Sequence, residues 1–358
     1  MKQLFKAAVL IGALLGFGFS APLQAASDGK KPAPAKKTAA GSKSGEKFVA
    51  TGARKPVAKT ELAKAPQKSA KSAKPAKSGS GKQVAAWEAP PKAIRRVSMA
   101  DVDPGRVALH SASALVIDQE TGQALLEKHA DVQVPIASIT KLMTAMVVLD
   151  AKLDLNEVIT ISDDDVDTLK GSRSRIPVGT TMTRETAMLL ALMSSENRAA
   201  NALGRHYPGG QAAFVRAMNA KARELGMRNS RFEEPTGLSS NNVSTAYDLS
   251  RMVAAAAGYP EIRIYSTNAE ATIDLNGRIQ EFRNTNGLVR NDNWVIGVSK
   301  TGYISEAGRC LVMQARVADK PVVMVLLDSQ GKMTRVGDAM RIKRWMESAS
   351  AATDRRNV

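Results

Sequence analysis

The chain contains 358 residues, of which 51 are Lys or Arg, 34 are Asp or Glu and one is Cys. A single cysteine excludes an internal disulfide and any Cys-rich zinc or iron–sulfur site. The three histidines form no His-Glu-x-x-His motif, which argues against a metalloprotease, and we expect neither a metal ion nor a cofactor.

The excess of positive charge belongs to one segment of the chain. Residues 27–96 contain 18 Lys and Arg and four acidic residues, whereas residues 97–358 contain 31 basic and 30 acidic residues. The larger part of the chain is therefore nearly neutral, and its charge gives no reason to expect a nucleic-acid partner.

The first 25 residues have the parts of a secretory signal peptide. Lys2 and Lys6 form a positive start. An apolar stretch follows at 7–19, shorter than the ~20 residues that span a bilayer. Leu23-Gln24-Ala25 then offers a cleavage site, so we expect export to the periplasm, with an uncleaved membrane anchor as the alternative.

The next segment, residues 26–106, is dominated up to about residue 96 by Lys, Ala, Ser, Pro and Gly. So few large apolar side chains cannot bury enough surface to offset the ordering entropy, so we expect a disordered tether. Its basic side chains would be attracted to anionic membrane or wall polymers. A solvated spacer without a partner is an equal alternative, because the charges follow no amphipathic pattern.

A folded domain is predicted at 107–348, followed by a C-terminal tail at 349–358. It begins with two apolar strands, 114–118 and 123–128, which form a hairpin, and continues with a mostly helical stretch at about 138–257. Later strands and a closing helix are predicted at 271–275, 294–301, 310–317, 321–327 and 334–348. Strands at both ends predict an α/β (α+β) fold, in which one sheet built from both ends of the domain is joined to a helical lobe.

One of four Ser-x-x-Lys sequences has a special setting. Ser138-Ile-Thr-Lys141 opens a helical pattern whose next residues, 142–149, are apolar almost all round, which predicts a buried helix. Ser138 and Lys141, three residues apart, project onto one helix face. Desolvation would favour the neutral amine, which could then accept the serine proton. An N-capping serine beside a lysine that reaches solvent is the simpler alternative.

A second motif, Ser195-Glu-Asn197, lies between helical patterns at 184–193 and 198–205. It could place a hydroxyl and an amide in a cleft. Taken alone, it is better explained as a polar loop between helices.

A third motif, Lys300-Thr301-Gly302, ends the predicted strand 294–301. An ammonium and a hydroxyl at the end of a strand can hold a carboxylate, and Gly302 would let a ligand lie close against the strand edge. A strand that simply ends in a turn is the alternative.

Together, the three motifs occur in the order that is typical of the active-site serine penicillin-recognising enzymes. The chain resembles their low-molecular-mass D-alanyl-D-alanine peptidases over about residues 114–345, and among these it most resembles the periplasmic D-alanyl-D-alanine endopeptidases. Other stretches carry the resemblance too, namely 135–150, 189–200, 234–238, 242–246 and 283–286. The resemblance implies a β-lactamase/D,D-peptidase-like fold, in which an antiparallel sheet is flanked by helices and accompanied by an all-helical lobe.

The resemblance also implies catalytic roles. Ser138 would be the nucleophile that forms an acyl-enzyme, and Lys141 would be the base that activates it. Ser195 would relay a proton to the leaving amine. The backbone N–H groups of Ser138 and Tyr303 would form the oxyanion hole.

Four further residues would bind the substrate. Asn197 would hold the substrate amide together with the Lys141 amine. Lys300, Thr301 and Gly302 would dock the carboxylate next to the scissile bond. The substrates implied are peptidoglycan stem peptides, with β-lactams as inhibitors.

The motifs leave the substrate preference open. An endopeptidase that cuts D-Ala cross-links and a carboxypeptidase that removes terminal D-Ala both handle a carboxylate beside the leaving nitrogen. The absence of a second β-rich domain after Gly302, together with the resemblance, favours the endopeptidase. A catalytically silent wall-binding module is less favoured, because it would have no need of Lys141.

Other polar residues are weaker candidates. The acidic cluster 163–167 resembles a calcium loop, but Thr168 and Ser174 stand where an EF-hand needs Gly and Glu, so we expect a solvated turn. Cys310 lies in an apolar run and is predicted to be a small buried residue. Glu233 and Glu234 lie near the position of a deacylating Glu in class A β-lactamases, but the surrounding sequence matches the peptidase pattern.

Overall fold

The computed structural model describes residues 107–354. The predicted signal peptide (1–25), the predicted tether (26–106) and the end of the predicted tail lie outside the described residues, so they remain predictions. Within residues 107–354, no helix is long and apolar enough to cross a bilayer.

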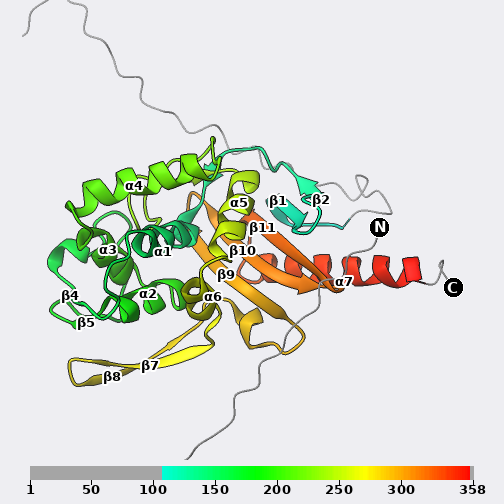
Figure 1. Cartoon of the computed structure of the whole chain (residues 1–358). Coiled ribbons are helices and arrows are strands. Elements are labelled where there is room, and N and C mark those ends of the chain that lie inside the picture. The colour runs from blue at the N-terminus through cyan, green and yellow to red at the C-terminus, as the bar shows by residue number, and fades with distance from the viewer. Residues whose placement is uncertain (1–106, 355–358) are drawn as a thin grey trace, which may run out of the picture. The chain divides into compact units, whose positions relative to one another are not determined.

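A five-stranded antiparallel sheet forms the centre of this part of the chain (Figure 1). The strands stand in the order β2-β1-β11-β10-β9, so the pairing of β1 with β11 joins the two ends of the domain. This confirms the predicted sheet built from both ends. The bounds of its strands are β1 Ser111–Asp118, β2 Ala124–Lys128, β9 Val295–Ile304, β10 Gly308–Val317 and β11 Lys320–Ser329.

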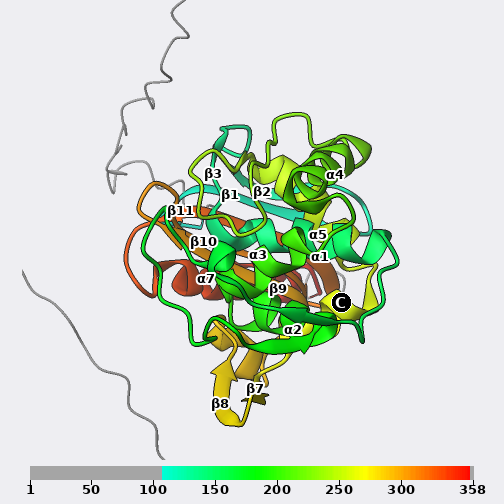
Figure 2. The ribbon, with the colours of Figure 1, turned by 90° about the vertical axis from the view of Figure 1, so that its left-hand side faces the viewer.

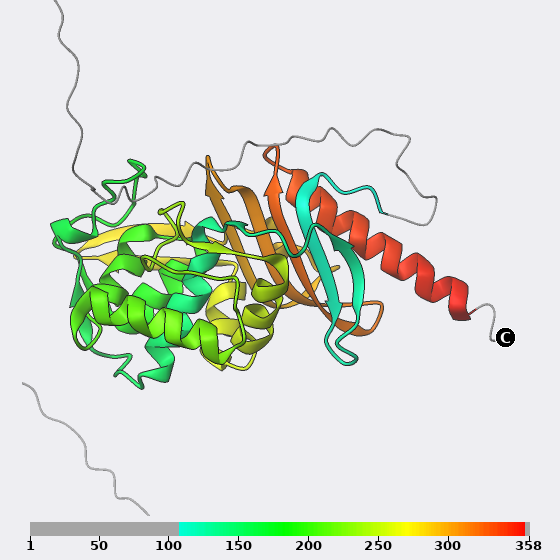
Figure 3. The same ribbon diagram turned by 90° about the horizontal axis from the view of Figure 1, so that it is seen from above.

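Both faces of the sheet are covered, which explains why its central strands are apolar almost without interruption. The helix α7, Thr334–Asp354, packs Ala339 and Ile342 into the apolar cluster on one face. On the other face lie α5, Ala246–Ala256, and α6, Pro260–Thr267. Figure 3 shows the sheet between α7 and the helical part of the molecule.

A helical lobe faces the viewer in Figure 2. The helix α1, Thr140–Asp150, runs through it with nine of its eleven residues buried, which confirms the predicted buried helix. The lobe is not all-helical as predicted, because it also contains a short antiparallel strand pair. Its other elements are α2 Arg184–Met193, α3 Asn197–Arg205, α4 Gly210–Glu224, β4 Val158–Thr160 and β5 Thr181–Thr183.

Short elements bring the chain around the start of α1 into position. The strand β3 pairs with β6, so that the segment leading to Ser138 lies beside residues 243–244. A 3-10 turn, η2, then connects β3 to α1. The bounds of the short elements are β3 Val134–Pro135, η2 Ala137–Ile139, η3 Asp163–Asp165, β6 Val243–Ser244 and η4 Gly287–Arg290.

One predicted strand is paired differently from the expectation, and one strand was not predicted. The strand expected at 271–275 exists as β7, Glu270–Leu275, but it pairs with β8, Arg278–Arg283, in a separate hairpin outside the main sheet. The turn residues Asn276 and Gly277 both have positive φ, as the favoured two-residue hairpin turn requires. Thus β8 was missed although its Asn-Gly turn is a recognised sequence signal.

The predicted C-terminal ends of one strand and of the closing helix were also wrong. The strand β9 does not stop at Thr301 but continues to Ile304, because its ladder with β10 continues through Gly302 opposite Cys310. The closing helix continues beyond Ser348 to Asp354, over Ala-rich sequence that favours a helix. Residues 349–354 therefore belong to α7 rather than to a tail.

Candidate active site

Ser138 and Lys141 lie at the junction of η2 and α1. Lys141 is fully buried, and its Nζ lies 2.9 Å from Ser138 Oγ. The same nitrogen donates to Asn197 Oδ1 at 2.7 Å and to the Thr236 carbonyl at 2.6 Å. The predicted shared face is therefore confirmed, although Ser138 lies in the 3-10 turn just before α1. A lysine that reaches solvent is excluded.

The surroundings of Lys141 suit a base. Burial lowers the pKa of its amine to about 7, and the negative charges of Glu234, Glu196 and Asp167 oppose the shift without cancelling it. A substantial fraction of the amine is then neutral near neutral pH. A neutral amine at hydrogen-bond distance can accept the proton of a serine hydroxyl.

Ser195 lies between α2 and α3 in a left-handed backbone conformation, with φ of 62°. Such a conformation is unfavourable for a residue with a side chain and persists only where the surroundings hold it. The next residue, Glu196, stabilises this backbone conformation. Its buried carboxylate accepts hydrogen bonds from Arg175 Nε at 2.8 Å and from Ser174 Oγ at 2.7 Å. Ser195 Oγ accepts a hydrogen bond from Lys300 Nζ at 2.9 Å.

Asn197 begins α3 and has a defined orientation. Its Oδ1 accepts from Lys141, and its Nδ2 donates to Ser172 Oγ at 2.8 Å. An amide nitrogen carries two hydrogens, so Asn197 retains a donor for a ligand.

The sheet wall of the site is β9. Lys300 is buried, and its Nζ donates to Ser195 Oγ and to the Thr301 carbonyl, both at 2.9 Å. Burial lowers the pKa of Lys300 well below its usual value, and the charges of Lys141 and Arg335 lower it further. Lys300 therefore lies behind the Ser195 hydroxyl, as Lys141 lies behind that of Ser138.

Gly302 has a structural role besides its predicted role in ligand binding, which stays a prediction. A Cβ at this position would lie 3.0 Å from the Ile136 carbonyl oxygen and 3.1 Å from the Ser138 nitrogen. The glycine thus lets the turn that carries Ser138 pack directly on β9. Gly237 has the same function on the other side, where a Cβ would meet the Ala137 carbonyl oxygen at 1.9 Å.

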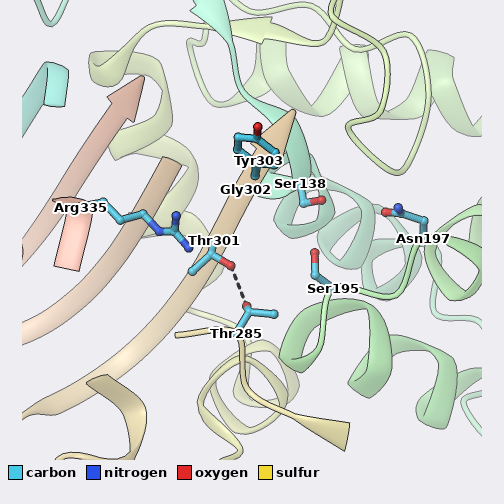
Figure 4. A pocket seen from close by; sticks show the side chains of 8 residues that line it. All are labelled: Ser138, Ser195, Asn197, Thr285, Thr301, Gly302, Tyr303 and Arg335. Atoms are coloured by element: carbon cyan, nitrogen blue, oxygen red, sulfur yellow. Dashed lines mark hydrogen bonds between the residues drawn. The ribbon is translucent and has the colours of Figure 1, made fainter. Parts of the chain in front are cut away.

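A cavity of about 260 Å³ lies between β9 and the two serines, and Figure 4 shows the side chains that surround it. The predicted site residues converge here although they are far apart in the sequence. The two lysines lie behind the lining rather than in it. The lining residues are Ser138, Ser195, Asn197, Thr285, Thr301, Gly302, Tyr303 and Arg335.

Two of these lining residues were not predicted. Arg335, in the first turn of α7, has Nε and Nη1 buried without a hydrogen-bond partner among the described residues. No local motif marks it, because it reaches the site only through the packing of α7. Thr285 accepts a hydrogen bond from Thr301, Oγ1 to Oγ1, at 2.7 Å. It lies within 283–286, a stretch that carried the family resemblance without an assigned role.

Glu234, which the sequence analysis set apart from the catalytic residues, has a structural role. It accepts hydrogen bonds from Thr236, Gly237 and Asn242. The carboxylate thereby holds the loop that offers the Thr236 carbonyl to Lys141.

The expectation of a solvated acidic turn at 163–167 is wrong for Asp165. Its carboxylate is buried and accepts hydrogen bonds from Arg205, Asn201 and the Ser162 backbone. The acidic turn therefore ties η3 to α3. Among the described residues, no group of three His, Cys, Asp or Glu side chains is arranged to hold a metal ion.

Cys310 is fully buried, as predicted. Burial raises the pKa of its thiol to about 12, so the thiolate is not formed near neutral pH. Cys310 is therefore a packing residue of β10 rather than a nucleophile.

The proteins that this chain resembles are D-alanyl-D-alanine peptidases. A family model described as D-alanyl-D-alanine carboxypeptidase, peptidase family S11, matches residues 98–331. A D-alanyl-D-alanine endopeptidase of Pseudomonas aeruginosa is 51% identical over 247 residues, which are 68% of this chain and 80% of the relative. One from Escherichia coli is 46% identical over 260 residues, 72% of this chain and 84% of the relative.

A solved structure shares the fold. The Streptomyces K15 DD-transpeptidase superposes with a TM-score of 0.62 at 28% sequence identity, covering 66% of this chain and 97% of that one. The fold class expected from the sequence is therefore confirmed.

Proposed function

The chain belongs to peptidase family S11, and from this membership we propose that it is a serine D,D-peptidase that hydrolyses D-Ala amide cross-links between peptidoglycan stem peptides. One observation carries the proposal. The hydroxyl of Ser138, which lines the cavity, lies 2.9 Å from a fully buried lysine, Lys141, with a pKa near 7.

Acylation follows from this geometry. The neutral Lys141 amine takes the proton of Ser138 as Oγ attacks the carbonyl carbon of the D-Ala amide. The backbone N–H groups of Ser138 and Tyr303 stabilise the negative oxygen of the tetrahedral intermediate. Ser195 passes a proton to the leaving nitrogen and receives in its place the proton that Lys141 took, so the C–N bond breaks, Lys141 is neutral again, and an ester on Ser138 remains. Water then hydrolyses that ester.

The carboxylate beside the scissile bond binds at the opposite end of the cavity. Thr301 offers a hydroxyl, and Arg335 offers buried guanidinium donors that no described residue uses. Lys300 adds positive charge from behind through its contact with Ser195 Oγ. A β-lactam has the same carboxylate and a reactive carbonyl, so it enters the site as an inhibitor.

Covalent labelling with penicillin tests the nucleophile. Ser138→Ala should abolish labelling, while Ser329→Ala, in another Ser-x-x-Lys sequence, should leave it intact. Labelling that persists in the Ser138→Ala protein would show that the acylated residue lies elsewhere, and a lack of labelling in the unaltered protein would favour a silent binding module.

The substrate class is tested by incubating the protein with cross-linked dimer muropeptides and with monomeric pentapeptides. Cleavage of the dimer supports the endopeptidase. Release of terminal D-Ala from the monomer alone would support a carboxypeptidase, the activity for which the family model is named.

We also propose export to the periplasm and attraction of the basic segment to anionic membrane or wall polymers, because residues 27–96 hold 18 basic and four acidic residues. Deletion of 27–96 should leave turnover of soluble muropeptides unchanged but reduce co-sedimentation with wall sacculi at low salt, where charges are least screened. Equal co-sedimentation of both proteins at low salt would instead support an inert spacer.

A further inference from the structure

Hydrogen bonds from the residues on either side of Thr285 fix its position at the cavity. The two asparagines beside it are buried. Asn284 donates to the Ser266 and Asn268 carbonyls, and Asn286 donates to Ser299 Oγ. Thr285 lies exposed between them and lines the cavity. The loop therefore has a fixed backbone that presents one hydroxyl to the site.

The same loop joins the two walls of the cavity. The Thr285 N–H donates to the Met193 carbonyl at 3.1 Å, at the end of α2 and just before Ser195. Its side chain reaches the other wall, where its Oγ1 lies 2.7 Å from Thr301 Oγ1 (Figure 4). Thr285 is thus fixed to the helical lobe while it contacts the strand that carries Thr301.

The number of protons limits what this pair of hydroxyls can do. Each threonine has one hydroxyl proton, and a carboxylate can only accept hydrogen bonds. If the Thr301 hydroxyl donates its proton to the substrate carboxylate, it can only accept in the hydrogen bond between the two threonines. Thr285 must then be the donor in that bond.

We infer that Thr285 is a positioning residue: when ligand binds, it donates to Thr301 Oγ1 and so directs the Thr301 proton at the ligand carboxylate. In the free enzyme Thr301 donates to Thr285, and a bound carboxylate reverses this order by taking the Thr301 proton. The inference rests on the proposed function, because it assumes that Thr301 meets the carboxylate.

The test compares two inhibitors that differ in one group. Benzylpenicillin has the carboxylate, and its methyl ester lacks the charge that Thr301 would meet. Thr285→Val should reduce the acylation rate of Ser138 by benzylpenicillin about tenfold, the loss expected for one hydrogen bond of this kind. With the methyl ester the loss should be less than about twofold, and Thr285→Ser should restore the rate with benzylpenicillin.

A second comparison shows whether Thr285 acts through Thr301. In a Thr301→Val background, Thr285→Val should cause no further loss with benzylpenicillin. A full additional loss would overturn the inference, because Thr285 would then act independently of Thr301. Equal losses with benzylpenicillin and its ester would also overturn it, since a general disturbance of the site affects both ligands.

Acylation of the unaltered protein by the two inhibitors shows whether a negative result concerns this inference or the proposed function. If neither inhibitor acylates it, the proposed function fails and the inference fails with it. If both acylate it and Thr285→Val is indistinguishable from the unaltered protein with both, only the inference fails. Thermal unfolding of each variant checks that the exposed substitution leaves the fold intact.

Discussion

The helical wall and the sheet wall of the cavity each bury one lysine, and each lysine lies 2.9 Å from a serine hydroxyl. Their other neighbours differ. Lys141 on the helical wall also contacts an amide oxygen and a carbonyl, and three carboxylates act on it from nearby. Lys300 on the sheet wall has a carbonyl and two positive neighbours, Lys141 and Arg335.

This difference assigns different tasks to the same residue type. Nearby carboxylates limit the effect of burial on Lys141 and leave its pKa near 7, so it can gain and lose a proton during each turnover. Positive neighbours add to the effect of burial on Lys300. The negative charge of a bound carboxylate would raise the pKa of Lys300, because an opposite charge nearby favours the protonated amine. Lys300 should therefore gain positive charge as an anionic ligand binds.

The largest expected effect comes from Lys141→Arg. Arginine retains the positive charge but does not deprotonate at working pH, so the base is lost. The acylation rate by penicillin should fall on the order of 10³-fold, within the usual contribution of general base catalysis. Rapid-mixing measurement of labelling checks this. Near-normal acylation would mean that another group, with Ser195 the first candidate, takes the proton.

A smaller loss is expected from Lys300→Met, which removes the charge on the sheet wall. Acylation by benzylpenicillin should fall about 10- to 100-fold, as expected for the loss of a hydrogen bond to a charged group. Its methyl ester should be affected less, because the ester does not need the positive charge. If both inhibitors lose the same factor, Lys300 acts through Ser195 rather than on the carboxylate.

The pH dependence of the unaltered protein gives a third test. Below its pKa, Lys141 is protonated and cannot accept the serine proton, so the acylation rate should rise with pH and level off above about 7. The rates should be measured from pH 5 to pH 9, with the methyl ester as the ligand without a negative charge. A rate that is independent of pH would contradict the assignment of Lys141 as the base.

The smallest effect is expected from Lys170→Met, because Lys170 is not among the residues that line the cavity. Lys170 pairs with Glu306 at 2.5 Å between the loop that carries Ser172 and the turn after β9, and the pair is partly exposed. It also lowers the pKa of Glu306 to about 2, so it persists over the pH range of the assay. Exposed pairs contribute about 1 kcal/mol or less, so penicillin acylation should change less than about twofold. A tenfold loss would show that the loop helps to hold Asn197.

The sequence predicted those features of the fold that depend on local pattern. Apolar runs predicted the strands of the main sheet, and the apolar stretch after Ser138 predicted a buried helix. It did not predict that β7 would leave the sheet, since periodicity identifies a strand but not its partner. The burial of Asp165 was missed for a similar reason, because its partner Arg205 lies 40 residues away.

In the candidate site too, some features followed from local sequence and others only from the tertiary structure. The sequence by itself determined the three motifs, their order and the pairing of Ser138 with Lys141, because residues three positions apart in a helix share a face. Only the tertiary structure placed Ser195 against Lys300 and brought Thr285 and Arg335 to the cavity. It alone also decided which charges surround each lysine, and therefore the pKa of each. Contacts between distant segments depend on how whole helices and strands pack, which no short stretch of sequence encodes.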